Sequence, residues 1–100
     1  MKRARFAAPA RRELLAEVAY YEAKEPGLGG RFVVAVEEAT ARALAYPLTG
    51  KPASERTRRM FLRGFPFALV YRPDDLGLVV FAVAHHARRP GYWRNRIDGG

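Results

Sequence analysis

The sequence predicts an α+β domain with the element order β-α-α-β-β-β, in which a helical hairpin packs on one face of an antiparallel sheet. Two stretches in the first half carry apolar residues at helical spacing, with a Pro-Gly break between them at positions 26–27. The second half carries three strand-like stretches separated by tight turns. The 100 residues fit one domain spanning 1–100, because domains of about 100–150 residues are the commonest.

The chain begins with a short strand that leads into a helix. Residues 3–7 alternate polar and apolar side chains, which is typical of a strand. Pro9 suits the first turn of a helix, because its missing N–H would have no intrahelical partner there. Leu14, Val18 and Tyr21 then recur at i, i+4 and i+7. This spacing predicts an amphipathic helix of roughly four turns that ends at the Pro-Gly break.

A second helix is predicted from about Leu28 to the Tyr-Pro pair at 46–47. Its apolar stripe is formed by Phe32, Val36, Ala39 and Ala43, widened by Val33, Thr40 and Leu44. The connector between the two helices is short, so the helices are expected to form an antiparallel hairpin. The apolar side of this hairpin must be buried against the sheet. We expect Leu14, Val18, Tyr21, Phe32, Val36 and Leu44 to pack against Leu69 and Val80, or against the neighbours of these two residues on the opposite sheet face.

The second half is predicted as a loop followed by a three-stranded meander. Residues 48–56 are polar and rich in turn formers, which favours a loop. Residues 57–63, 67–72 and 78–85 have strand patterns, and the turn between the last two spans 73–77. Because the connections are short, these three strands are expected to pair antiparallel.

The charge is strongly basic, with a formal net charge of +8. Residues 51–100 carry ten basic and four acidic residues, whereas residues 1–50 carry eight and six. Such an excess favours an anionic partner: nucleic acid, a nucleoprotein or an acidic protein segment. The alternative is a solvated Arg-rich surface without a partner. No apolar run approaches the ~20 residues of a membrane helix, so a cytoplasmic protein without a membrane partner is expected.

Cofactor and metal chemistry find little support in the sequence. The absence of Cys excludes a disulfide scaffold and a thiolate site. On a strand His85 and His86 point to opposite faces, and the acidic residues are distant in sequence, so no metal site is expected. A structural, hydrogen-bonded role is expected for these His residues; a general acid–base role for one of them is the alternative. No Gly-rich phosphate loop follows a strand, and no cofactor is expected.

The segment 85–96 is the most informative one, because four Arg residues interleave there with Tyr92 and Trp93. Guanidinium groups can contact phosphates, and aromatic rings can stack on bases. The alternative is that both rings fold back onto the sheet edge while the Arg residues stay solvated. Arg59 and Arg63 share a strand face with Phe61, and that face can extend the same basic surface if it lies away from the helices.

Several short segments, in this order and spacing, give the chain a family resemblance that covers nearly its whole length. They are Phe6-Ala7-Ala8-Pro9-Ala10 before Leu14, Ala19-Tyr20-Tyr21-Glu22, Pro26-Gly27-Leu28-Gly29 before Arg31-Phe32, Tyr46-Pro47, Thr57-Arg58-Arg59, Phe65-Pro66-Phe67-Ala68-Leu69-Val70-Tyr71-Arg72, and Ala82-Val83-Ala84-His85 followed by Arg88-Arg89-Pro90-Gly91-Tyr92-Trp93 and Arg96. With them the chain resembles the RelE/ParE superfamily of bacterial type II toxin–antitoxin toxins, and more closely the ParE-like, plasmid-stabilisation branch.

The resemblance implies a growth-inhibiting toxin that a cognate antitoxin neutralises, in a toxin–antitoxin hetero-oligomer. Because of the net charge of +8, the antitoxin is expected to bind as an extended or helical acidic segment that lies in an apolar groove with Arg residues at its rim. ParE-like members inhibit DNA gyrase and are not nucleases, whereas RelE-like members cut mRNA on the ribosome and often use a C-terminal Tyr. The Arg-Arg-Pro-Gly-Tyr-Trp ending favours the ParE-like interpretation. A non-toxic basic nucleic-acid-binding module is a further alternative.

The two mechanisms assign different roles to overlapping residues. For a ParE-like toxin, the expected target-binding residues are Arg58, Arg59, Arg88, Arg89, Tyr92, Trp93 and Arg96. For a RelE-like endoribonuclease, the expected catalytic residues are Arg59, Arg63, His86, Arg88 and Tyr92. The sequence therefore leaves open whether the protein is an enzyme.

Overall fold

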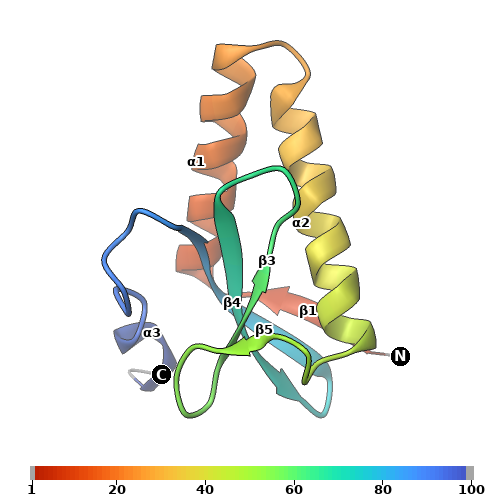
Figure 1. Ribbon diagram of the computed structural model, residues 1–100, viewed down its shortest axis with the longest axis vertical. Helices are drawn as coiled ribbons and strands as arrows, with labels where there is room; N and C mark the ends of the chain where they lie inside the picture. The colour runs from red at the N-terminus through yellow and green to blue at the C-terminus, as the bar shows by residue number, and fades with distance from the viewer. Residues whose placement is uncertain (1, 99–100) are drawn as a thin grey trace.

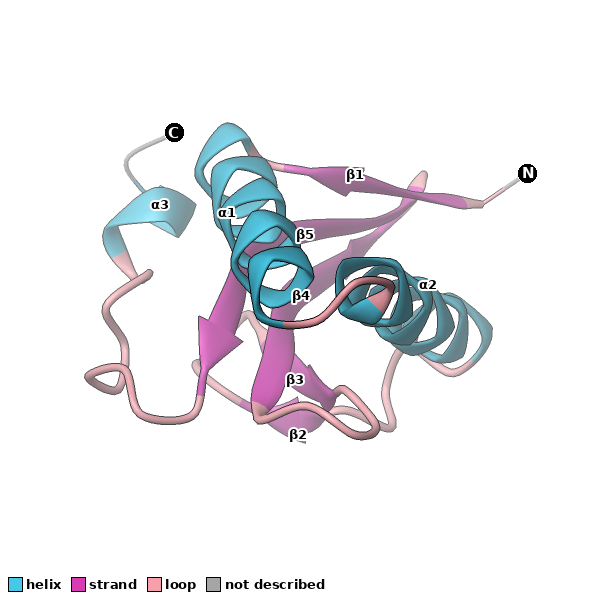
Figure 2. Ribbon diagram, turned by 90° about the horizontal axis from the view of Figure 1, so that it is seen from above, coloured by secondary structure: helices cyan, strands magenta, loops and turns pink. Residues whose placement is uncertain are grey.

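The computed structural model describes residues 2–98 and confirms the predicted α+β class. Two long helices cover one face of a five-stranded sheet, as seen from two directions in Figures 1 and 2. The elements are β1 (Arg3–Phe6), α1 (Ala8–Lys24), α2 (Leu28–Ala45), β2 (Lys51–Pro52), β3 (Arg58–Phe61), β4 (Phe67–Asp74), β5 (Gly77–His85) and α3 (Asn95–Asp98). Within this range no helix combines the length and apolarity needed to cross a lipid bilayer.

The strand order is β1-β5-β4-β3-β2. The predicted antiparallel meander is confirmed for β3, β4 and β5. The first strand differs, because β1 pairs parallel to β5 and makes the sheet mixed. Gly77 permits this pairing: its φ is +132°, and a Cβ there would lie 2.1 Å from the Arg3 carbonyl oxygen.

The predicted turn 73–77 is shorter than expected, because β4 continues to Asp74 and β5 begins at Gly77. Two further details of the strand prediction are wrong. The first is β2, a two-residue strand inside the predicted loop 48–56, where it pairs with β3. The second is the length of β3, which ends at Phe61 rather than at residue 63. The chain leaves the regular strand at Leu62, whose side chain is buried in the core, and Arg63 is therefore not aligned on a strand face with Arg59.

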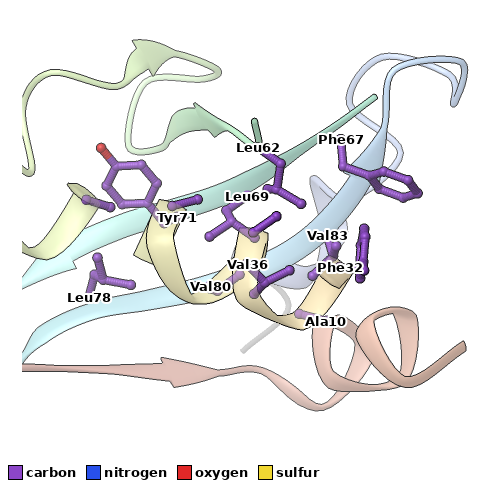
Figure 3. Packing of buried hydrophobic residues seen from close by; sticks show 13 residues of the cluster. Ala10, Phe32, Val36, Leu62, Phe67, Leu69, Tyr71, Leu78, Val80 and Val83 are labelled. Carbon is purple, nitrogen blue, oxygen red and sulfur yellow. The ribbon is translucent and has the colours of Figure 1, made fainter. Parts of the chain in front are cut away.

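The main core lies between the helices and the sheet, as predicted. Phe32 and Val36 of α2 are buried in one cluster with Leu69 and Val80, and Figure 3 shows these side chains facing one another. Leu14, Val18, Tyr21 and Leu44 pack against the same cluster and are half-buried. The Tyr21 ring stacks on Phe32, with ring centroids 5.3 Å apart. These contacts confirm the predicted helix faces.

The opposite face of the sheet is partly covered by the chain beyond β5. Trp93 is buried there with Val70 of β4 and Ala82 of β5, and Tyr92 and Ile97 pack beside them. The predicted alternative for Trp93 was a position on the sheet edge. The structure instead places its ring on a sheet face, because successive residues of a strand point to opposite faces and Val70 and Ala82 present an apolar patch there.

Adjacent leucines on α1 provide a test of these helix faces. Leu14 packs against the core, whereas Leu15 is 61% exposed. We expect Leu14→Ala to lower the free energy of unfolding by about 2 kcal/mol, the low end for Leu-to-Ala changes because the site is only half-buried. Leu15→Ala is the matched control and should cost less than about 0.5 kcal/mol. Equal urea midpoints for the two variants would contradict the assigned faces.

Candidate functional site

A cleft of about 300 Å³ opens on the sheet face that lies away from α1 and α2. Its floor is formed by Ala68, Val70 and Ala84 of the two central strands. Arg59 and Phe61 of β3 form one wall, and the segment 86–94 forms the other. We call this the basic cleft, because its lining holds four Arg side chains and no Asp or Glu. The four are Arg59, Arg88, Arg89 and Arg94.

The strand pairing explains why the cleft forms here. Arg59 lies opposite Val70 and Phe61 lies opposite Ala68, so all four side chains share one face of the sheet. Ala68 in turn pairs with Ala84. Two alanines across from each other leave space above the sheet that larger side chains would fill, and the arginine and phenylalanine beside them stand at its border.

The far wall is held by a tight turn and by a buried ring. The His86 N–H donates a hydrogen bond to the Pro66 carbonyl at 2.9 Å, which continues the pairing just beyond β5. Gly91 has a φ of +76°, and a Cβ there would lie 2.4 Å from Nε of Arg94. Together with the packing of Trp93, this turn keeps the cleft arginines 88, 89 and 94 beside the sheet.

One carboxylate ties the C-terminal segment to the rest of the fold. Glu13 of α1 accepts hydrogen bonds from the Val83 N–H at 3.0 Å, the Tyr92 hydroxyl at 2.8 Å and both terminal nitrogens of Arg96 at 2.9 and 3.0 Å. Arg96 also donates to the Phe81 carbonyl. Burial by itself would raise the pKa of Glu13, but the hydrogen bonds from Arg96, Tyr92 and Val83 outweigh it, so the pKa lies below its usual value.

Two guanidinium groups lie against the Tyr92 ring. The Arg88 guanidinium lies 3.9 Å from the ring centroid, and that of Arg96 lies 5.0 Å away. Burial, and then the hydrogen bond to Glu13, raise the pKa of the Tyr92 hydroxyl far above its ordinary value. The Tyr92 hydroxyl donates a hydrogen bond to Glu13 at 2.8 Å, and this contact links the C-terminal segment to α1.

The two His residues point to opposite faces, as predicted. The His85 ring packs edge-on against Phe67 with centroids 4.9 Å apart, and its Nδ1 accepts a hydrogen bond from the Ala87 N–H. The exposed His86 ring packs edge-on against Phe61, with centroids 5.5 Å apart, at the border of the basic cleft. Within residues 2–98 no group of three or more His, Asp or Glu residues is close enough to hold a metal ion.

The structure brings some of the expected site residues together and separates others. Those that line the basic cleft are Arg59, His86, Arg88, Arg89, Tyr92 and Trp93. Arg58 is turned to the other face and donates to the carbonyls of Leu48 and Gly50. Arg63 lies beyond the end of β3, outside the lining, and Arg96 is engaged by Glu13.

Three residues that line or support the basic cleft are not among the site residues expected from the sequence: Arg94, Phe61 and Glu13. Arg94 stands in the Arg-rich segment, and Phe61 shares the strand face of Arg59, so both had a signal in the sequence. Glu13 had none, because it lies 79 residues before the Tyr92 hydroxyl that it accepts from. Trp93 was expected as a contact residue, but it is only 5% exposed and offers little surface to a partner.

Comparisons with known proteins agree with this architecture. A family model described as ParE toxin of type II toxin-antitoxin system, parDE, matches residues 4–90. A solved structure titled Chromosomal ParDE TA system from P. aeruginosa is similar with a TM-score of 0.72 and 17% sequence identity, over 85% of this chain and 96% of that one. At this identity the likeness concerns the fold alone. No match is found among curated proteins.

The family match covers all of α1 through β5 and reaches into the wall of the basic cleft. The similarity in fold to the solved ParDE structure is consistent with this family match. The chain therefore belongs to the ParE toxin family of type II toxin–antitoxin systems.

Proposed function

We propose that this toxin arrests growth by inhibiting DNA gyrase through binding, without breaking a covalent bond itself. The main support for this proposal is the hydrogen bond that the Tyr92 hydroxyl donates to Glu13. RelE-like chemistry would use that hydroxyl in proton transfer, yet here it donates to Glu13 and its pKa is raised. His86 is the other candidate for proton transfer, and the cleft lining offers it no carboxylate partner. A binding surface fits this set of side chains better than an acid–base pair does.

The contact surface proposed for the target is the basic cleft with the exposed Arg88 and Arg89 on its wall. Arg is enriched at interface positions that contribute most to binding, and each such contact can supply ~2 kcal/mol or more. We expect the double variant Arg88→Gln/Arg89→Gln to lose growth arrest and inhibition of gyrase supercoiling. Tyr92→Phe and His86→Ala should each retain most of both activities, because no bond-breaking step is lost.

A matched control exists on α1. Arg11 and Arg12 are also adjacent and exposed, and they lie outside the cleft. Arg11→Gln/Arg12→Gln removes the same charge and should leave growth arrest intact. Growth is compared at equal soluble expression, with a DNA-damage reporter and primer extension on mRNA. Cleavage of mRNA that disappears in Tyr92→Phe, together with growth arrest, would overturn gyrase inhibition in favour of ribosome-dependent mRNA cleavage.

We further propose that the cognate antitoxin binds the apolar groove on the helical side of the molecule. This groove, of about 400 Å³, lies between β1, α1 and α2 and is lined by Ala4, Phe6, Leu14, Val33, Val36, Glu37, Thr40, Ala41 and Leu44. The expected Arg rim is not part of this lining, whose one charged residue is Glu37. Apolar contact is therefore expected to supply most of the affinity.

Adjacent valines on α2 test the antitoxin site. Val33 lines the groove, whereas Val34 is 50% exposed and lies outside it. We expect Val33→Glu to weaken antitoxin binding at least tenfold, because a carboxylate would be buried under the bound segment without a partner. Val34→Glu should bind normally. Titration calorimetry with the product of the neighbouring gene gives the affinities, and equal affinities of the two variants would exclude this groove.

A further inference from the structure

We propose that the basic cleft binds a single-stranded nucleic-acid segment, with phosphates on its arginines and an unstacked base on the exposed ring of Phe61. This goes beyond inhibition of gyrase as such, because it assigns the toxin its own contact with a phosphodiester strand. The described part of the chain has three ion pairs, which involve Arg5, Arg31 and Arg96. None of the cleft arginines takes part in them.

The concentration of positive charge is the first argument. Arg59 approaches from the sheet, while Arg88, Arg89 and Arg94 approach from the opposite wall, and no carboxylate lies among the lining residues. Four cations around one hollow repel one another unless an anion sits between them. A guanidinium fork matches a phosphate with two parallel hydrogen bonds, which a lysine ammonium cannot make.

The aromatic border is the second argument, and it distinguishes a nucleic acid from an acidic peptide. Phe61 is 39% exposed although it is a large apolar side chain on a regular strand. Its ring is braced edge-on by His86 at 5.5 Å, and the Lys51 ammonium lies 5.9 Å from its centroid. A flat exposed ring beside phosphate-binding cations is the combination used to hold single strands, because every base offers a face for stacking. The side chains of Asp and Glu have no flat apolar face that could stack on this ring.

The chemistry of the cleft fits a DNA or an RNA strand, and the experiment separates these sources. Fluorescence anisotropy of the full chain is measured with a labelled 12-nucleotide DNA, the RNA of the same sequence, the DNA duplex and a polyglutamate peptide. We expect a single strand to bind more tightly than the duplex and the peptide. Whichever of the two single strands binds with the higher affinity shows whether the cleft prefers deoxyribose or ribose.

Variants then locate the contact. Arg59→Gln and Arg89→Gln should each reduce the slope of log affinity against log salt by about 1, whereas Arg11→Gln should leave the slope unchanged. Phe61→Leu keeps an apolar side chain and should weaken single-strand binding roughly fivefold or more through lost stacking. Its effect on duplex binding should be negligible. Circular dichroism confirms that each variant is folded.

Two results would overturn the inference: polyglutamate binding as tightly as the single strands, or single-strand binding that is unaffected in both Arg59→Gln and Phe61→Leu. The test of single-strand binding can fail or succeed independently of the test of gyrase inhibition. Gyrase supercoiling that is inhibited by the wild-type protein, with no single-strand binding by that same protein, would sink the inference and leave gyrase inhibition standing. Single-strand binding without gyrase inhibition would do the reverse.

Discussion

Trp93→Ala is expected to lower the free energy of unfolding by roughly 3–5 kcal/mol, the usual cost of removing a buried aromatic ring. The Trp93 side chain is 5% exposed and packs on Val70 and Ala82, on the side of the sheet that α1 and α2 do not reach. Tyr92 and Ile97 pack on the same cluster. Losing the indole therefore leaves a cavity and also loosens the wall of the basic cleft.

Urea unfolding followed by far-UV circular dichroism measures this effect. Trp93→Phe is the control, because it keeps a ring in the same place. Its loss of unfolding free energy should be less than half of the loss in Trp93→Ala. An unchanged midpoint in Trp93→Ala would mean that the ring is not part of the folded core. The result also bears on toxicity assays: loss of growth arrest in a Trp93 variant reports a damaged fold, so contacts with the target are better tested through Arg88 and Arg89.

Glu13→Gln is expected to lower the free energy of unfolding by about 3 kcal/mol. The side chains of Glu13 and Arg96 are 17% and 18% exposed, so removal of the carboxylate charge leaves a largely buried guanidinium without its counterion. The amide also has one acceptor oxygen where the carboxylate uses two, so the bonds to Val83, Tyr92 and Arg96 cannot all persist.

The effect of Glu13 has a defined pH dependence. Its pKa in the folded protein lies below the ordinary value of 4.5, because hydrogen bonds to the carboxylate outweigh the opposing effect of burial. Its contribution to stability is therefore full above about pH 4.5 and is lost as the pH falls through the lower folded pKa.

The stability difference between wild type and Glu13→Gln should consequently be largest at neutral pH and shrink toward pH 3. Glu17→Gln, one turn further along α1, is the matched control and should change stability little at either pH. A Glu13→Gln difference that stays constant from pH 7 to pH 3 would show that the carboxylate charge is not what holds the C-terminal segment.

The element order and the buried helix faces were accessible from the sequence, because they depend on local periodicity. Phe32 and Val36 recur at helical spacing, and the strands alternate, so each segment already indicates which of its sides is apolar. The same alternation placed Arg59 and Phe61 on one face. The Arg-rich composition of segment 85–96 indicated a basic surface, and this segment forms the other wall of the cleft.

The tertiary structure decided what each of these charged and aromatic groups does. Arg96 and Arg94 are two residues apart and chemically identical, yet one is engaged by Glu13 and the other lines the basic cleft. Tyr92 and Trp93 are neighbours with aromatic side chains, yet the Trp93 ring is buried on the sheet and the Tyr92 hydroxyl donates to Glu13. The reason is physical: an ion pair or a packed ring depends on which distant segment lies beside it, and only the folded chain brings α1 beside the C-terminal segment. Local sequence patterns carry no record of a contact across 83 residues, such as the one between Glu13 and Arg96.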